Sequence, residues 1–318
     1  MLLEINDIDI SYGDKLTVQD FSLKLGEGKI CSLVGESGSG KTTVIRAVLG
    51  LLPGAGKVTK GDILFEGNSL LQYSPAQWRE LRGTDISMIF QDSGAMMNPT
   101  KRIGSVFVEY IRTHKSVSKA EAWDMGVKML ERMHLPNGDN VMRSYPFQLS
   151  GGMRQRAVIA LATFMSPNVV LADEPTTALD VVVQRGILMM LMDLQKQFKN
   201  TLVIVSHDMG VHYQITDRMG IMYSGSFVEL GPTEAIFDDP IHPYTKMLIG
   251  ALPRVGDKSQ KVGIPGRPPA LKNPPPGCRF AARCPQATDK CRQDPPPEFR
   301  EIRPGRFAAC HYLESEVN

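Results

Sequence analysis

The sequence of 318 residues lacks an apolar run long enough to span a membrane. Its longest apolar stretches, Ala157 to Met165 and Gly186 to Met192, fall well short of the roughly 18 to 20 residues that a spanning helix requires. The first residues, Met1 to Asp7, include acids and lack the basic start and apolar core of a signal peptide. We therefore expect neither a membrane span nor export, so that any work at a membrane is done from one side.

The sequence also lacks a large excess of charge of either sign. The 36 Lys and Arg residues face 34 Asp and Glu residues, a formal net charge of +2, which argues against a strongly electropositive nucleic-acid binder. Hydrophobic residues make up 42% of the chain and charged residues 22%, which argues against a disordered or fibrous protein. Five cysteines without an export signal are not expected to form a disulfide framework. No C-x-x-C pair and no solenoid-type repeat is present.

The pattern of apolar residues predicts an α/β fold. The first thirty residues alternate apolar and polar positions, which predicts an antiparallel sheet. A strand is expected at Lys29 to Val34 and a helix at Lys41 to Leu51, and the pattern turns helical from about residue 100 to 165. Strand-like runs separated by helical stretches then return at Val169 to Ala172, Leu202 to Val205 and Arg218 to Tyr223. This alternation predicts a parallel sheet covered by helices on both faces.

Proline marks a change of composition near the C-terminus. Of the 22 prolines, 12 lie after residue 252. Long helices and central strands are not expected there, because proline lacks an N–H donor and fixes φ. We therefore predict an α/β domain over residues 1–240, with a helical subdomain at about 92–165, and a C-terminal extension over 241–318.

A glycine-rich loop follows the strand that ends at Val34. It fits the phosphate-loop pattern G-x-x-x-x-G-K-[ST] at every fixed position. The glycines let backbone N–H groups wrap phosphates, Lys41 bridges the outer phosphates, and Thr42 offers its hydroxyl to Mg²⁺. The predicted nucleotide-binding residues are Gly35, Ser37, Gly38, Ser39, Gly40, Lys41, Thr42 and Thr43.

Two acids follow the apolar run Val169 to Ala172. In this position one carboxylate can bind the metal ion of the nucleotide, and the other can polarise a water. We assign Asp173 to the metal and Glu174 to the role of general base. Paired acids after a strand are as often solvated loop residues, but the phosphate loop in the same chain favours the catalytic interpretation.

The segment from Leu149 to Met153 reads Leu-Ser-Gly-Gly-Met and resembles the signature of the ATP-binding-cassette (ABC) ATPases, which is usually LSGGQ. Ser150 can cap the next helix, and Gly151 and Gly152 expose N–H groups at its positive end. The resemblance implies a P-loop NTPase fold with a RecA-like parallel sheet, an N-terminal antiparallel β subdomain and a helical insert. It also implies that Ser150, Gly151 and Gly152 bind the ATP of an opposing subunit, so hydrolysis needs a head-to-tail dimer.

Further residues match the ABC pattern one by one. Tyr12 resembles the aromatic residue that stacks on adenine. Gln91 matches the glutamine that contacts Mg²⁺ and the attacking water and joins the helical insert to the core, so the implied Mg²⁺ ligands are Thr42, Gln91 and Asp173. Asp180, after Ala178-Leu179, matches the loop that contacts the partner subunit. His207, after a predicted strand, resembles the switch histidine that senses the γ-phosphate of ATP.

The C-terminal extension narrows the resemblance. Its start, Ile241 to Lys246, followed by proline-rich sequence with cysteines, is similar to the ATP-binding subunits of oligopeptide, dipeptide and nickel importers of the D type. Gln91-Asp92 followed by Met97-Asn98-Pro99 also fits, with Ser93 where proline is usual. The resemblance implies a heterodimer with a second, homologous ATPase at the cytoplasmic face of the cell membrane. It also implies two integral membrane permease subunits, an external substrate-binding protein and no nucleic acid.

Because the catalytic motifs are intact, we predict an ATP-hydrolysing subunit that powers import of peptides or related substrates. Two other functions compete with it. A soluble ABC ATPase acting on nucleic acid or ribosomes is expected to have fused cassettes, a long coiled-coil insert or a basic surplus, and the sequence has none of these. A scaffold that binds ATP without hydrolysing it is disfavoured by the Asp173-Glu174 pair and His207.

Four of the five cysteines lie after residue 277, at Cys278, Cys284, Cys291 and Cys310. Their spacing disfavours a zinc ribbon, but four thiolates suffice for a cluster. Basic residues exceed acids between Cys278 and His311, and positive charge would offset an anionic iron–sulfur centre. The importer resemblance also implies a [4Fe–4S] cluster, with zinc and free or disulfide cysteines as alternatives. Cys31 is expected to pack in the core.

Overall fold

The computed structural model describes residues 1–91, 94, 97–177, 179–206, 209–252, 263–271 and 274–315, except for the side chains of residues 314 and 315. The chain forms two compact units. One unit combines Met1–Gln72 with Val205–Asn318, and the other spans Tyr73–Ile204. The first unit is therefore assembled from two separate segments of the chain, and the boundary expected at residue 240 stays a prediction.

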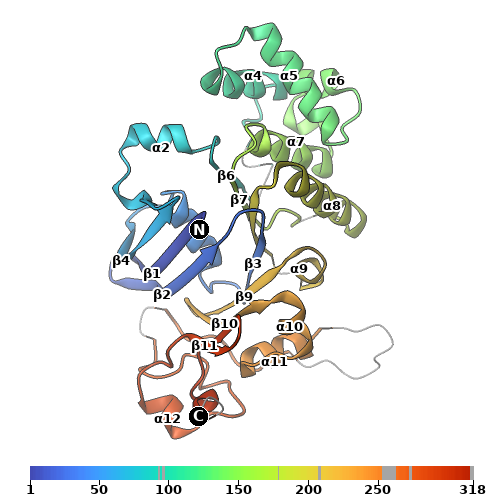
Figure 1. The fold of residues 1–318 in the computed structure, drawn as a ribbon. Helices are drawn as coiled ribbons and strands as arrows, with labels where there is room; N and C mark the ends of the chain where they lie inside the picture. The colour runs from blue at the N-terminus through green and yellow to red at the C-terminus, as the bar shows by residue number, and fades with distance from the viewer. Residues whose placement is uncertain are drawn as a thin grey trace. The chain divides into compact units, whose positions relative to one another are not determined.

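An antiparallel sheet forms the N-terminal part of the first unit, as the alternation predicts (Figure 1, blue). Its strand order is β2-β1-β4-β5, with the bounds β1 (Leu3–Tyr12), β2 (Lys15–Leu25), β4 (Gly56–Phe65) and β5 (Asn68–Ser69). The register of β1 against β2 shifts between Ile5 and Ile8. This irregularity resets the alternation, because Ile5, Ile8 and Ile10 are all buried.

A second sheet region of the first unit contains the strand before the phosphate loop. The order is β11-β12-β10-β9-β3, and β3 runs parallel to β9. The bounds are β3 (Ile30–Val34), β9 (Arg218–Tyr223), β10 (Ser226–Pro232), β11 (Arg300–Arg303) and β12 (Arg306–Ala308). The helices of this unit are α1 (Lys41–Val48), α9 (Met209–Ile215), α10 (Thr233–Asp238), α11 (Pro243–Gly250) and α12 (Asp289–Gln293), with 3-10 turns at Leu70–Gln72 and His311–Ser315.

The second unit combines parallel strands with the predicted helical insert. Strands β6 (Ile86–Ile89) and β7 (Val169–Asp173) pair in parallel, and β8 (Thr201–Val205) is the neighbour of β7 in the sheet. The helices are α2 (Pro75–Leu81), α4 (Ile103–His114), α5 (Lys119–Arg132), α6 (Gly138–Arg143), α7 (Gly151–Thr163) and α8 (Val181–Phe198), with a 3-10 turn at Pro146–Gln148. Within the described parts of the chain, no helix has both the length and the apolar character that crossing a membrane requires.

The C-terminal extension shares a buried core with the rest of the first unit. One buried cluster combines Val34 of β3 and Ile221 of β9 with Tyr244 of α11 and Phe280 of the proline-rich segment. As expected from the prolines, the described residues after 252 form only short elements. Strands β11 and β12 were not predicted, and they take the edge of the sheet beside β10, where few ladder bonds are needed.

The buried carboxylate of Glu229 fixes this packing. Glu229 of β10 is fully buried, and its oxygens accept hydrogen bonds from the backbone N–H groups of Ile241 and His242, both at 2.9 Å. The guanidinium of Arg306 donates from 3.0 Å. A buried carboxylate requires such partners, since an unpaired charge away from water is costly. Glu229 therefore ties the entry to α11 and strand β12 to the same point of the sheet.

His242 gives this packing a dependence on pH. Its ring is 1% exposed, Nδ1 accepts from the backbone N–H of Tyr244 at 3.0 Å, and burial lowers its pKa from 6.5 to about 3. Because the unfolded state then binds the proton more tightly, the stability contributed by neutral His242 is complete above pH 6.5. It is lost as the pH falls from 6.5 toward 3.

We expect His242→Asn, which keeps an acceptor at the start of α11, to remove this titration. Between about pH 7.5 and about pH 5.5, the free energy of unfolding of the wild type should fall by about 1.4 kcal/mol more than that of the variant. Urea unfolding followed by circular dichroism measures both. Equal pH dependences would show that His242 does not titrate differently on folding.

Candidate functional site

The phosphate loop adopts a backbone that only glycine accepts easily. Gly38 and Gly40 have φ of 77° and 98°, in the left-handed region. A Cβ atom on Gly40 would lie 3.0 Å from a methyl group of Val18, and one on Gly35 would collide with the carbonyl oxygen of Met222. The two fixed glycines of the motif are therefore needed for close packing as well as for the turn. Helix α1 begins directly after the loop, at Lys41.

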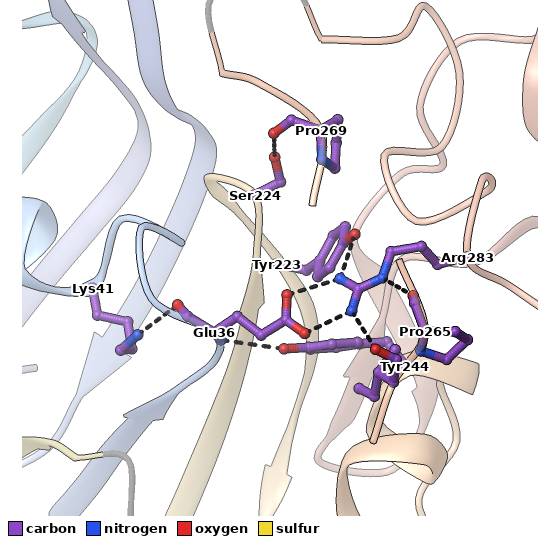
Figure 2. Close-up of polar contacts among 9 residues, drawn as sticks. Glu36, Lys41, Tyr223, Ser224, Tyr244, Pro265, Pro269 and Arg283 are labelled. Atoms are coloured by element: carbon purple, nitrogen blue, oxygen red, sulfur yellow. Dashed lines mark hydrogen bonds and ion pairs between the residues drawn. The ribbon is translucent and has the colours of Figure 1, made fainter. Parts of the chain in front are cut away.

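Lys41 is folded back over the loop that precedes it. Its side-chain Nζ donates to the carbonyl oxygen of Glu36 at 2.9 Å (Figure 2). It also donates to the carbonyl oxygen of Gly35 at 2.8 Å and to Ser39 Oγ at 3.3 Å. The residue is 5% exposed. The ammonium is thus held beside the loop backbone, where the motif needs a cation for phosphate.

The structure places the other residues predicted to bind nucleotide but does not test their roles. Ser37 is exposed, and Thr42 and Thr43 lie half-buried in the first turn of α1. Tyr12 ends β1, where it pairs with Gly56 of β4, and its ring packs against that glycine. Its stacking on adenine stays a prediction.

In the second unit, a hydrogen bond joins the side chains of Gln91 and Glu174. Glu174 follows β7 with φ of 48°, and its side-chain Oε2 accepts two hydrogen bonds. Gln91 Nε2 donates to this atom at 2.7 Å, and the hydroxyl of Thr177 donates to it at 2.9 Å. Asp173, the last residue of β7, is 1% exposed. Two fixed donors orient the carboxylate of Glu174 before any substrate binds.

Thr177 was not singled out from the sequence. It stands three residues after Glu174, in a turn closed by the bond from its N–H to the Glu174 carbonyl at 3.2 Å. A hydroxyl three residues after an acid is a common feature of turns. The sequence alone therefore does not show that this hydroxyl binds the side chain of Glu174.

Two helix N-termini carry the remaining signature residues of this unit. Ser150 Oγ accepts from the N–H of Met153 at 3.3 Å, which confirms the predicted cap of α7. A Cβ on Gly152 would lie 2.7 Å from a methyl group of Val183, so this glycine also allows α7 to approach α8. Asp180 caps α8 by accepting from Val182 and Val183 at 3.1 and 2.9 Å. The roles of Ser150, Gly151, Gly152 and Asp180 toward an opposing subunit stay predictions.

Some predicted positions lie outside the described residues. These are His207, the expected γ-phosphate sensor, together with Ala178 beside Asp180 and the positions Asp92 and Ser93 after Gln91.

The four C-terminal cysteines are free thiols that influence one another. Burial, with a smaller contribution from the neighbouring Cys310, Cys291 and Cys284, raises the pKa of Cys278 to about 11. The pKa values of Cys284 and Cys310 are also raised, chiefly by burial. The N–H of Cys278 donates to the carbonyl of Cys291 at 2.8 Å. In the described portion of the chain, no three His, Cys, Asp or Glu side chains are arranged to hold a metal ion.

Three basic residues of this segment form ion pairs with acids from other parts of the chain. Arg283 pairs with Glu36 at 2.8 Å, Arg303 with Asp239 at 2.6 Å, and Arg306 with Glu229 at 3.0 Å. These acids lie outside the segment. The local excess of positive charge is therefore compensated elsewhere in the first unit, and the argument from charge for an anionic cluster loses its force.

Two family models match this chain. The model described as "ABC transporter" matches residues 18–177, and the model described as "Oligopeptide/dipeptide transporter, C-terminal region" matches residues 228–291. The first covers the phosphate loop and the carboxylates, and the second covers α11 and the first three of the clustered cysteines.

Relatives and solved structures agree with these models. The oligopeptide transport ATP-binding protein OppD of Salmonella typhimurium is 40% identical, over 98% of this chain and 93% of that protein. The dipeptide transport ATP-binding protein DppD of Bacillus subtilis is 41% identical, over 91% of this chain and 88% of that protein. A dimeric post-hydrolysis structure of an ATP-binding cassette, bound to ADP and Pi, has a TM-score of 0.65 over 73% of this chain and 99% of that chain. At 24% identity, this likeness confirms the expected fold alone.

We expect Thr177→Val to slow ATP turnover by about 10-fold or more, because the substitution removes a hydrogen bond that orients the Glu174 carboxylate. Thr177→Ser keeps the hydroxyl and should stay near the wild-type rate. Steady-state ATPase assays on the assembled complex measure both variants, with little change expected in KM. A valine variant as fast as the serine variant would show that the hydroxyl does not orient the carboxylate.

Proposed function

This chain belongs to the ABC transporter family and, within it, to the ATP-binding subunits of oligopeptide and dipeptide transport, and from that premise we propose how its residues divide the work. The protein is an ATP-hydrolysing subunit that powers peptide import through a membrane ABC transporter. Its relatives are transport proteins, which favours this function over action on nucleic acid or ribosomes.

The hydrogen bonds that hold Glu174 carry the proposed mechanism. Glu174 acts as the general base, since its carboxylate is oriented by Gln91 at 2.7 Å and Thr177 at 2.9 Å. The attacking water gives its proton to Glu174 as its oxygen bonds to the γ-phosphorus, and ADP leaves. Gln91 positions the water, and His207 senses the γ-phosphate.

The phosphate loop and the remaining motif residues bind the nucleotide. Lys41 and the loop N–H groups contact the phosphates, and Tyr12 stacks on adenine. Thr42, Gln91 and Asp173 are the proposed ligands of Mg²⁺, an assignment that rests on the family motifs. When bound, Mg²⁺ neutralises charge on the phosphates.

We propose that hydrolysis takes place in a head-to-tail dimer. Ser150, Gly151 and Gly152 then bind the ATP of the opposing subunit through the N-terminus of α7, and the loop at Asp180 contacts that subunit. The capped helix start and the dimeric state of a solved structural relative support this arrangement. The opposing subunit is a second, homologous ATPase, and both work under two membrane permease subunits on the cytoplasmic face. An external binding protein delivers the substrate.

We also propose that Cys278, Cys284, Cys291 and Cys310 bind a [4Fe–4S] cluster. The proposal is supported by the backbone hydrogen bond of 2.8 Å from Cys278 to the carbonyl of Cys291, together with the influence of the neighbouring thiols on the pKa values of Cys278 and Cys310. The thiolates that bind the four irons of a cluster lie farther apart than the thiolates that bind a single metal ion, so a cluster does not require the close grouping that a single ion requires. Cysteine binds iron as a thiolate, so cluster binding releases protons, and it staples a segment that has little core of its own.

Glu174→Gln tests the general base. We expect ATP turnover by the assembled transporter to fall by about 100-fold or more, while nucleotide binding to the isolated chain is retained. Glu131→Gln, at an exposed position of α5, is the matched control and should hydrolyse ATP like the wild type. Substantial residual hydrolysis in Glu174→Gln would remove Glu174 from this role.

Metal analysis of protein purified without oxygen tests the cluster. About four iron atoms per chain and a broad absorption band near 400 nm, roughly, are expected in the wild type and in Cys31→Ala, whose cysteine lies in β3 and is not one of the four proposed ligands. Both signals should be lost in Cys284→Ser. Stoichiometric zinc, or a well-folded wild type without metal, would contradict the proposal.

A further inference from the structure

Arg283 of the C-terminal extension has every donor of its guanidinium occupied (Figure 2). Nε donates to the carbonyl of Pro265 at 2.7 Å, and the Nη atoms donate to Tyr223 Oη and the carbonyl of Ile264, both at 3.1 Å. The remaining two donors bind both carboxylate oxygens of Glu36, at 2.8 and 2.9 Å. The Arg283 side chain is 5% exposed. Such a bidentate pair fixes the position and the plane of both groups.

Glu36 is the second residue of the phosphate loop, at a position that the motif leaves variable. Its main chain is held as firmly as its side chain. The N–H of Glu36 donates to the hydroxyl of Tyr244 at 3.2 Å, and its carbonyl accepts from Lys41 Nζ at 2.9 Å. Tyr244 is fully buried, with its ring 4.7 Å from that of Tyr223. The extension therefore contacts the loop through a packed aromatic pair and a buried arginine.

A second contact holds the other end of the loop. The N–H of Gly225, in the turn between β9 and β10, donates to the carbonyl of Ser39 at 3.1 Å. This turn also accepts a hydrogen bond from Arg279 at the Ser224 carbonyl. With Glu36 and Ser39 both fixed, the loop between them is held in one conformation before nucleotide arrives. Preorganisation of this kind raises affinity, because less conformational entropy is lost on binding.

We propose that Arg283 is a positioning residue that holds the phosphate loop through Glu36, so that the C-terminal extension sets the affinity of the site for ATP. The inference rests on the proposed nucleotide site and adds a residue that lies 247 positions from its contact in the loop. Because Arg283 lies next to Cys284, the cysteine segment presents the arginine that grips the loop. Any change that displaces this segment should weaken ATP binding.

Nucleotide titration and steady-state kinetics of Arg283→Met and Glu36→Gln test the inference. With a fluorescent ATP analogue and the isolated full-length chain, we expect Arg283→Met to raise Kd by about 10- to 100-fold. In the assembled complex KM should rise similarly, whereas kcat should change by less than about 3-fold, because the arginine acts on binding and not on Glu174. Arg283→Lys keeps the charge but not the fork, so its Kd should lie between those of the wild type and Arg283→Met.

A double-mutant cycle separates the contact from general damage. If Arg283 acts through Glu36, then Glu36→Gln combined with Arg283→Met should be little worse than Arg283→Met alone. Arg292→Gln, at an exposed arginine of the same extension, is the matched control and should bind ATP like the wild type. If circular dichroism shows that Arg283→Met does not fold, the Kd of Glu36→Gln replaces that of Arg283→Met. A higher Kd than in the wild type supports the inference, and an unchanged Kd overturns it.

An unchanged Kd in folded Arg283→Met, or fully additive effects in the cycle, would overturn the inference. Both results would leave the proposed function intact provided that the wild-type complex hydrolyses ATP. If the wild-type complex did not hydrolyse ATP, the proposed function would fail instead. The two failures are therefore distinguishable in the same set of assays.

Discussion

The buried carboxylate of Glu229 is the interaction on which the C-terminal half of the first unit depends. Its charge has no contact with water, so it must be met by donors from the protein, and these come from the start of α11 and from β12. Once α11 is fixed, Tyr244 lies beside Tyr223 and reaches the phosphate loop at Glu36. The buried carboxylate of one β-strand thus helps to determine where the phosphate loop receives its support.

Much of this architecture could be predicted from the sequence. The glycine loop, the strand before it and the helix after it follow from local spacing, because each uses residues close together in the chain. The ABC resemblance assigned both Gln91 and Glu174 to the attacking water, but it did not predict the hydrogen bond of 2.7 Å that joins them across 83 positions. The edge strands β11 and β12 were missed because their short runs carry no clear alternation and lie among prolines.

The contacts that support the phosphate loop could not be predicted in this way. Glu36 stands at a variable motif position, and Arg283 was counted only as one of several basic residues near the cysteines. Nothing local links an acid and an arginine that are 247 positions apart. The same limit applies to the basic surplus near the cysteines, since the acids that pair with Arg283, Arg303 and Arg306 lie in distant elements.

The discontinuous first unit also constrains how the protein is made. Strand β3 and the phosphate loop leave the ribosome early, but their parallel neighbour β9 begins at Arg218 and the arginine that grips the loop is residue 283. Nascent chains emerge from the N-terminus, so the loop is exposed without its sheet partner during most of synthesis. Assembly of a firm nucleotide site must then wait until residue 283 has been made, which couples nucleotide binding to synthesis of the cysteine segment.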